Sequence, residues 1–393
     1  MKLGYRANIW KYYLFYFLFN FSFIGGILIP FFTEWGGLNF TQTMFLQSWF
    51  MFWTFLLEIP TGAVADYMGR KHSLILAAFL NGVGFLVYVS QSNFYVFLLG
   101  EFILAMALAL VSGAGEAFVY DSLKKMGKES VSKRVFARIQ TFKLLGIMIG
   151  APIGSLIAGI YGLRLPVILM SVPLTLATLL AITFKEPKTS KKIESKRYIK
   201  IVKEGIKYFR DNRVLKILAF DIIIIATAGY LMIWLYQPLL EQAGVPIEYF
   251  GFVHAFLVLS QIFIMNTYGK LEEIVKSKKK MLFLSSLITG LMFLVGGLTN
   301  LIPLIIIVIL IGGGFGLTRR PLFASYINKH VPSSERATIL STISMLRRFL
   351  VAIINPIIGM LVDWSLNYTF ILIGIIVLIT TFFSKVEEEY LID

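Results

Sequence analysis

The stretch GAVADYMGRKHSL, residues 62–74, separates two long apolar segments. FLQSWFMFWTFLLEIPT precedes it at 45–61, and ILAAFLNGVGFLVYV follows it at 75–89. Each flanking segment is part of an apolar run that can cross a bilayer core of about 30 Å as a helix. The pattern indicates a short polar loop between two membrane spans.

The same alternation of apolar runs and short polar joints continues along the chain. Of the 393 residues, 57% are hydrophobic and 15% are charged, and the mean hydropathy is +0.77, whereas soluble domains are about 25% charged. The apolar runs are continuous and do not alternate, which favours helices over a barrel. We therefore predict an all-α integral membrane protein with twelve transmembrane helices. The predicted spans are about 9–32, 41–62, 73–91, 94–120, 135–159, 163–184, 213–239, 248–268, 280–298, 301–327, 338–361 and 367–384.

One long polar segment, residues 185–213, divides these spans into two groups of six. It holds eleven Lys and Arg residues against four Asp and Glu residues. Ile199, Val202, Ile206 and Phe209 recur within it at helical spacing, which predicts an amphipathic helix at the membrane surface. The predicted domains are a six-helix bundle over 1–184, a basic linker over 185–213 and a second bundle over 214–393.

Basic residues predict how the chain is oriented, because loops rich in Lys and Arg stay in the cytoplasm. With the N-terminus inside, the external loops hold only Arg164. We expect a multi-pass protein of the cell membrane with both termini cytoplasmic. The net charge of +15 is then an orientation signal, and no nucleic-acid partner is expected.

No pattern in the chain predicts an enzyme. There is no cysteine, the three histidines are too scattered for a metal site, and neither a phosphate loop nor a nucleophile triad is present. We expect no cofactor.

The two halves resemble one another. YGKLEEIVKSKKKMLF (268–283) stands where GAVADYMGRKHSL stands in the first half, and INPIIGMLVD (354–363) matches GAPIGSLIAG (150–159). Repeated halves are typical of transporters, which bind substrate near the membrane midplane between the repeats.

GAVADYMGRKHSL resembles the loop signature G-x-x-x-D-x-x-G-R-K of the major facilitator superfamily, at the family's place between spans 2 and 3 of twelve. The resemblance covers nearly the whole chain. It implies two six-helix bundles related by a pseudo-twofold axis and a cytoplasmic gate motif. In that motif Asp66 sits against the start of span 11, Arg70 pairs with Asp121, and Gly62 and Gly69 permit tight turns and close helix approach.

Among the branches of this family, the chain most resembles the drug/proton antiporters, but its sequence differs from their motifs at three places. Glu101 stands where span 4 of the family often carries Arg, and Asn20 stands where some exporters carry an acid. GAPIGS (150–155) only approximates the antiporter signature G-P-x-x-G-G of span 5.

Carboxyl groups at bilayer depth cost about 2.5–3.5 kcal/mol or more, so we expect them to face a cavity or an opposite charge. Glu101 and Glu116 lie on one face of span 4. A buried carboxyl can load and release a proton as a gate alternates. Glu116, Glu101 and Asp221 are the candidate proton-coupling residues, and a permanent salt bridge is the alternative.

Basic side chains at matching depth in spans 5 and 11 predict an anion site. Lys143 and Arg348 are the favoured pair, facing each other across the pseudo-twofold axis. The alternative is that such cations neutralise the buried acids. The full set of candidate cavity residues is Lys143, Arg348, Arg347, Arg319, Arg320 and Glu58.

We therefore expect a secondary active transporter that moves a small organic solute by alternating access, with proton-coupled export as the favoured mode. A uniporter or importer of an organic anion is one alternative, and a non-transporting sensor or lipid-moving protein on the same fold is another. The expected partners are the solute, protons and the lipid bilayer, with the chain acting as a monomer.

Overall fold

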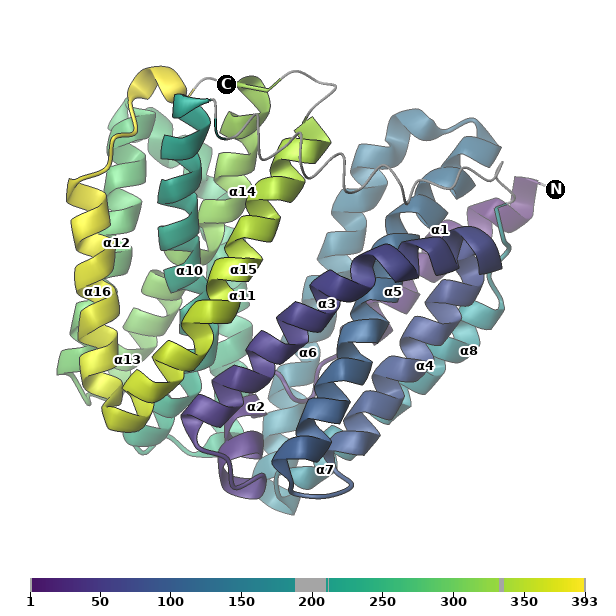
Figure 1. The fold of residues 1–393 in the computed structure, drawn as a ribbon, viewed down its shortest axis with the longest axis horizontal. Helices are drawn as coiled ribbons and strands as arrows, with labels where there is room; N and C mark the ends of the chain where they lie inside the picture. The colour runs from purple at the N-terminus through teal and green to yellow at the C-terminus, as the bar shows by residue number, and fades with distance from the viewer. Residues whose placement is uncertain (1, 188–209, 211, 332–335, 392–393) are drawn as a thin grey trace. The chain divides into compact units, whose positions relative to one another are not determined.

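The structure, a computed structural model, describes residues 2–187, 210, 212–331 and 336–391, apart from a few side chains within these ranges. Every regular element in them is helical (Figure 1). The amphipathic helix predicted within 185–213 lies almost entirely outside the described residues.

Nine helices in the described part of the chain are long and apolar enough to cross a membrane. Three more apolar helices, α1 (Lys2–Phe19), α3 (Phe40–Met68) and α16 (Leu366–Phe382), stand at the remaining predicted spans. The all-helical membrane fold predicted from the sequence is confirmed.

Contacts divide the chain into two units. Unit 1 comprises Met1–Tyr198 and Ile247–Ala255, and unit 2 comprises Ile199–Pro246 and Phe256–Asp393. The start of α11 (Phe250–Val275) packs closely on unit 1. A Cβ added to Gly26 would lie only 2.5 Å from the Cα of Gly251. The domain limits drawn from the sequence, which place 247–255 in the second bundle, stay a prediction.

Unit 1 is built from the helices of the first half of the chain, joined by short turns. They are α1 (Lys2–Phe19), α2 (Leu28–Pro30), η1 (Phe31–Trp35), α3 (Phe40–Met68), α4 (Arg70–Tyr88), α5 (Phe94–Met126), η2 (Glu129–Val131), α6 (Ser132–Tyr161), α7 (Arg164–Leu169) and α8 (Ser171–Ile182).

Unit 2 is built mainly from the helices of the second half. They are α10 (Arg213–Gln242), η3 (Ile247–Tyr249), α11 (Phe250–Val275), α12 (Lys278–Leu298), α13 (Ile302–Ile307), η4 (Val308–Gly312), α14 (Gly313–Lys329), α15 (Arg336–Trp364), α16 (Leu366–Phe382) and η5 (Glu388–Tyr390), with η3 and the start of α11 assigned to unit 1.

Local sequence explains where several helices begin. Asn39 and Gln42 form a reciprocal capping box at the start of α3. Asn93, Asn212, Ser277 and Ser365 each accept a hydrogen bond from a backbone amide in the first turn of the helix that follows. These side chains satisfy amides that have no partner within the helix.

The first predicted span, 9–32, is not one helix. α1 ends at Phe19, the chain turns without regular structure through residues 20–27, and a short helix resumes at Leu28. This irregular segment packs against α6 at Gly150. A Cβ added to Gly150 would lie only 2.6 Å from the backbone nitrogen of Ser22. Irregular backbone is tolerated at membrane depth only where it is buried in protein or lines a cavity. The break therefore marks a specialised part of unit 1.

Candidate functional site

Residues 62–74, predicted as a polar loop, are helical except at Gly69, where the chain turns sharply from α3 into α4. Gly69 has φ of +95°, in the region that favours glycine, and it both ends α3 and precedes α4. The turn brings Arg70 into an ion pair with Asp121 near the end of α5. Gly62 lies where α3 approaches α5, with its Cα 3.5 Å from the position of a Cβ on Gly113. The side chain of Asp66 lies outside the described residues, so its place in the gate motif stays a prediction.

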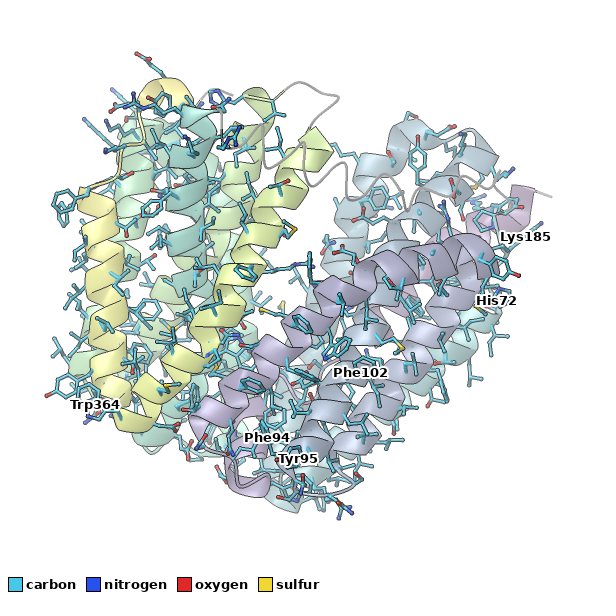
Figure 2. All side chains as sticks on the ribbon, viewed as in Figure 1. His72, Phe94, Tyr95, Phe102, Lys185 and Trp364 are labelled. Atoms are coloured by element: carbon cyan, nitrogen blue, oxygen red, sulfur yellow. The ribbon has the colours of Figure 1, made fainter. Side chains whose placement is uncertain are left out.

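An acid that the sequence analysis did not single out closes this turn. Glu186, four residues after α8, accepts hydrogen bonds from the backbone amides of Arg70 at 2.9 Å and Lys71 at 2.7 Å. Asn8 on α1 fixes the same segment by bonding to both the backbone nitrogen and the carbonyl oxygen of Lys185. Figure 2 shows Lys185 and His72 near one end of unit 1, and Phe94 and Tyr95 near the other.

Glu101 is buried in unit 1 and has neutral partners. Its side chain is 3% exposed, and it accepts a hydrogen bond from the Gln47 amide at 2.9 Å and one from the Tyr88 hydroxyl. Gly100 makes room for the Tyr88 ring, which a Cβ at that position would strike. Among the described residues, no Lys or Arg forms an ion pair with Glu101. Its carboxyl group can therefore change its protonation state without breaking a salt bridge.

Glu116 lies farther along α5 in a different environment. Its side chain is exposed in unit 1, and its charge interacts with the hydroxyl groups of Tyr12 and Tyr16 on α1. The two span-4 acids therefore differ in burial: Glu101 is enclosed and Glu116 is open.

Asp221 in unit 2 is bound to Arg319. The Nε and Nη2 atoms of Arg319 lie 3.0 and 2.6 Å from the same carboxylate oxygen of Asp221. The Nη1 atom donates to the Leu282 carbonyl and to the Ser285 hydroxyl, each at 2.9 Å. Both charged side chains are almost fully buried. The structure therefore makes Arg319 the counter-charge of Asp221, which is the alternative that the sequence left open for buried cations.

The remaining predicted cavity residues are divided between the two units. Lys143 on α6 is half-buried in unit 1, as is Glu58 on α3. Arg347 and Arg348 on α15 are half-buried in unit 2, and the side chain of Arg320 lies outside the described residues. Pairing of Lys143 with Arg348 across a pseudo-twofold axis stays a prediction.

A pocket of about 320 Å³ lies in unit 1 beside the break in the first span. Its polar lining consists of Asn20 and Ser22 from the break, Asn81 from α4 and His254 from α11. Phe19, Phe50 and Phe85 add aromatic surface, and no Asp, Glu, Lys or Arg is among the residues that line it. Volume and lining both match a small-molecule site, which is typically about 300–1,000 Å³ and mostly apolar with a few polar groups.

The pocket is connected to Glu101 through two helices. Leu104 of α5 lines the pocket one helical turn from Glu101, and Phe85 of α4 lines it one turn from Tyr88. The Phe85 and Tyr88 rings are in edge contact, with centroids 5.9 Å apart. The Phe85 and Tyr88 rings therefore connect the pocket wall to the Tyr88 hydroxyl, which binds the Glu101 carboxyl group.

Sequence reasoning did not place His254, Asn81 or Ser22 in the candidate site. Asn81 interrupts the apolar run 74–87, and His254 interrupts the shorter apolar run 250–259, which is a usable signal. The break at 20–27 carried a second signal in the adjacent Gly25 and Gly26.

Known proteins of the same architecture are transporters. A nucleoside transporter structure matches with a TM-score of 0.80 at 12% identity, over 95% of this chain and 98% of that chain. A D-xylose-proton symporter matches with a TM-score of 0.71 at 13% identity, over 99% of both chains. A bacterial homologue of the human lysosomal transporter Spinster, in an inward-facing and unoccupied conformation, matches with a TM-score of 0.72 at 15% identity, over 100% of this chain and 97% of that chain. At these identities the likeness shows the fold.

The sequence profile of the Major Facilitator Superfamily matches residues 13–354. The chain belongs to this superfamily, and both the superfamily and the solved structures that share its fold are those of membrane transporters, not of enzymes.

Curated relatives match over part of their length. The L-fucose-proton symporter of Escherichia coli (strain K12) is 29% identical over 135 residues, 34% of this chain and 30% of the relative. A glucose/galactose transporter of Brucella abortus biovar 1 (strain 9-941) is 22% identical over 189 residues, 44% of this chain and 45% of the relative. The matched region thus spans less than half of either relative.

Proposed function

We propose that the protein is a proton-coupled transporter of a small, neutral, polar solute that binds in the pocket of unit 1. The observation that carries the proposal is the break in the first span. Residues 20–27 leave the helix and supply Asn20, Ser22 and Gly25 to the pocket. Transporters commonly bind substrate where a membrane helix is discontinuous, because freed backbone groups are available there.

The lining of the pocket supports a neutral solute. Amide, hydroxyl and imidazole groups can exchange hydrogen bonds with hydroxyl groups, and the Phe rings offer faces to the apolar side of a sugar or base. A charged solute would enter without a counter-charge among the lining residues, at a large desolvation cost. Two relatives are named for sugar transport and one structural neighbour for nucleosides, which agrees with this class. An organic anion held by Lys143 and Arg348 is the second candidate.

Glu101 is the proposed proton-coupling residue. It is enclosed, it has neutral partners, and it is connected to the pocket through Tyr88 and Phe85. A buried carboxylate without a counter-charge is costly, so solute binding that alters the Tyr88 hydrogen bond changes the cost of its charge. Glu116 is the second candidate, and Asp221 is disfavoured because Arg319 already neutralises it.

The 62–74 loop is the proposed cytoplasmic gate latch. The ion pair of Arg70 with Asp121 and the cap from Glu186 fix the turn between α3 and α4. Contacts made in only one gate state shift the balance between states. In this proposal both termini are cytoplasmic, the membrane is the cell membrane, and the chain works as a monomer.

The direction of transport depends on whether the proton moves with the solute, as in symport, or against it, as in antiport. The relative named as a symporter supports uptake of solute together with protons. Export by antiport, expected from the sequence, rests on the approximate signature GAPIGS and is the second candidate. The two are separated in proteoliposomes, where an acidic exterior drives accumulation by a symporter, and an acidic interior drives it by an antiporter.

The test uses purified full-length protein and defined probes. Binding is followed by intrinsic tryptophan fluorescence with D-glucose, L-fucose, D-xylose and uridine, and with lactate as an anionic probe. We expect a neutral probe to bind, and Asn81→Ala and His254→Ala to weaken its binding about tenfold or more, as when a buried hydrogen bond is lost. Lys143→Gln is the matched control and should bind normally. Binding of lactate alone, abolished by Lys143→Gln, would replace this proposal with the anion site.

A further inference from the structure

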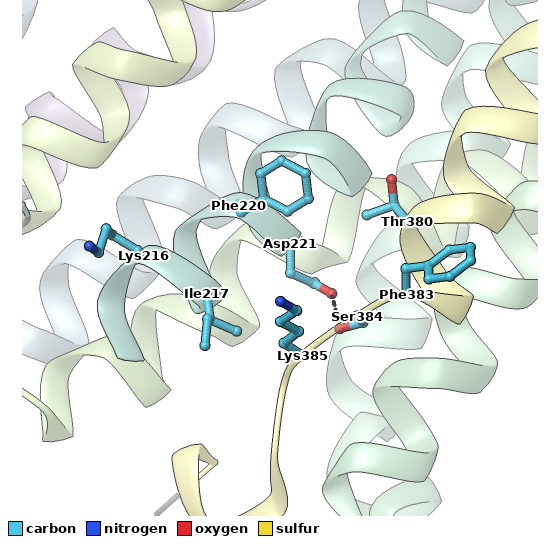
Figure 3. A pocket seen from close by; sticks show the side chains of 8 residues that line it. All are labelled: Lys216, Ile217, Phe220, Asp221, Thr380, Phe383, Ser384 and Lys385. Atoms are coloured by element: carbon cyan, nitrogen blue, oxygen red, sulfur yellow. Dashed lines mark hydrogen bonds between the residues drawn. The ribbon is translucent and has the colours of Figure 1, made fainter. Parts of the chain in front are cut away.

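A second pocket, of about 290 Å³, lies in unit 2 between the start of α10 and the residues that follow α16. Figure 3 shows Lys385 beside Ser384, on the segment that leaves α16, facing Asp221 and Ile217 of α10. We infer that this pocket binds the phosphate of an anionic membrane phospholipid.

The charge of the pocket favours an anion. Lys216 and Lys385 line it and are exposed, and neither has an ion-pair partner among the described residues. The acid at its inner wall, Asp221, is already neutralised by Arg319 and accepts a hydrogen bond from the Ser384 hydroxyl at 3.3 Å. Within the described part of the chain, these two basic charges therefore have no counter-charge, and the hydroxyl groups of Thr380 and Ser384 lie beside them.

The surroundings of the pocket favour a lipid over a soluble ion. Phe220 is 62% exposed and Phe383 is 78% exposed, and both line the pocket. Lys216 lies in the first turn of α10 and Lys385 lies three residues beyond the end of α16, so both lysines stand at helix ends, where a membrane boundary is expected. Basic residues at this level attract anionic headgroups. The aromatic side chains beside them would contact the acyl chains.

Unit 1 fills the corresponding place with its own side chains. The segment after α8 is held by Asn8 of α1, and the Nζ atom of Lys185 lies 4.7 Å from the centre of the Tyr5 ring. In unit 2 the segment after α16 is held by Asp221 of α10, which accepts a hydrogen bond from Ser384. No aromatic ring among the described residues makes a cation–π contact with Lys385. The difference leaves a charged pocket in unit 2.

The test measures stabilisation of the detergent-purified full chain by a short-chain phosphatidylglycerol. We expect the lipid to raise the midpoint of thermal unfolding. In Lys216→Gln/Lys385→Gln the lipid concentration that gives half of this effect should rise about tenfold or more. The matched control Lys270→Gln/Lys280→Gln removes the same charge from exposed positions of unit 2 outside the pocket, and it should respond like the unaltered protein. Both double variants exchange exposed side chains, so they are expected to fold.

Three results would overturn the assignment. One is an equal response to phosphatidylglycerol in both double variants. Another is equal stabilisation by phosphatidylcholine, which carries no net charge. The third is full stabilisation by inorganic phosphate alone, which would assign the pocket to a soluble phosphate. The inference is independent of the solute and of Glu101, so either proposal can fail alone.

Discussion

Glu186 in unit 1 and Glu388 in unit 2 cap equivalent helices of the two halves. Each follows the last long helix of its half and accepts hydrogen bonds from two successive backbone amides at the start of an earlier helix. Glu186 binds the amides of Arg70 and Lys71 at the start of α4. Glu388 binds the amides of Lys278 and Lys279 at the start of α12, and the Ser277 hydroxyl at 2.6 Å. The similarity between segments 62–74 and 268–283 thus extends to the acids that cap the helix beginning in each.

The Glu388 cap predicts a pH-dependent stability. Partial desolvation works against the charge of Glu388, but the Ser277 hydroxyl and the amides of Lys279 and Lys278 outweigh it and hold the pKa of this carboxyl below its usual value. A depressed carboxyl pKa stabilises the fold above the unfolded-state pKa, and this stabilisation is lost as pH falls through the folded-state pKa. Glu388→Gln should therefore lower the thermal midpoint at neutral pH, by the equivalent of about 0.3–1 kcal/mol.

The measurement is thermal unfolding of both proteins over a pH series. The difference between Glu388→Gln and the unaltered chain should shrink as the medium becomes acidic. A difference that stays constant down to acidic pH would show that the cap does not depend on the charge. Glu389→Gln, an adjacent exposed acid, is the matched control and should change little.

The buried ion pair predicts a strongly non-additive pair of variants. Asp221→Leu or Arg319→Met alone leaves one buried charge without its partner, which costs about 3–5 kcal/mol. The double variant removes both charges and should be more stable than either single variant. Folded yield by size-exclusion chromatography and the thermal midpoint report this. If the two single effects simply add in the double variant, Asp221 and Arg319 are not coupled as the structure shows.

The latch predicts a loss of transport without a loss of folding. Arg70→Ala and Asp121→Asn each break an ion pair whose side chains are 20% and 11% exposed, so the thermal midpoint should fall, but less than for the more deeply buried pair of Asp221 with Arg319. Uptake into proteoliposomes should fall severalfold. Lys71→Ala is the control in the same loop, since its backbone amide still reaches Glu186. Equal uptake by all three variants would refute the latch.

Orientation can be checked with single cysteines, because the chain has none of its own. Tyr95, at one end of α5, is 75% exposed, and Lys128 is exposed beyond the other end. Tyr95→Cys should react with an impermeant maleimide added to whole cells, and Lys128→Cys should react only after lysis. The opposite pattern would reverse the proposed topology.

Much of the fold could be predicted from the sequence because lipid leaves few choices. Continuous apolar runs had to be helices, and Gly69 and Arg70 identified the turn between α3 and α4. Side-chain partners were harder, because they depend on which helix faces meet. Nothing in the spacing of Asp221 and Arg319 shows that they meet, and the sequence placed them in different roles.

The pocket could not be predicted from hydropathy because it lies beside a break in the first membrane helix, at residues 20–27. Hydropathy alone predicts one span over 9–32, and the departure from helix at Phe19 depends on α6 receiving the irregular backbone at Gly150. Single polar groups such as Asn81 and His254 also fit ordinary packing when each is read alone. Their common site becomes visible only when α1, α4 and α11 are placed together in unit 1.

The most direct test of proton coupling compares Glu101→Gln with Glu116→Gln in proteoliposomes. The probe is whichever of D-glucose, L-fucose, D-xylose or uridine the unaltered protein takes up fastest. Exchange of labelled for unlabelled probe needs no net proton movement, whereas accumulation against a gradient does. We predict that Glu101→Gln loses accumulation driven by the pH gradient and keeps exchange, and that Glu116→Gln keeps both. Gradient-driven accumulation by Glu101→Gln at the rate of the unaltered protein would contradict the proposed role of Glu101.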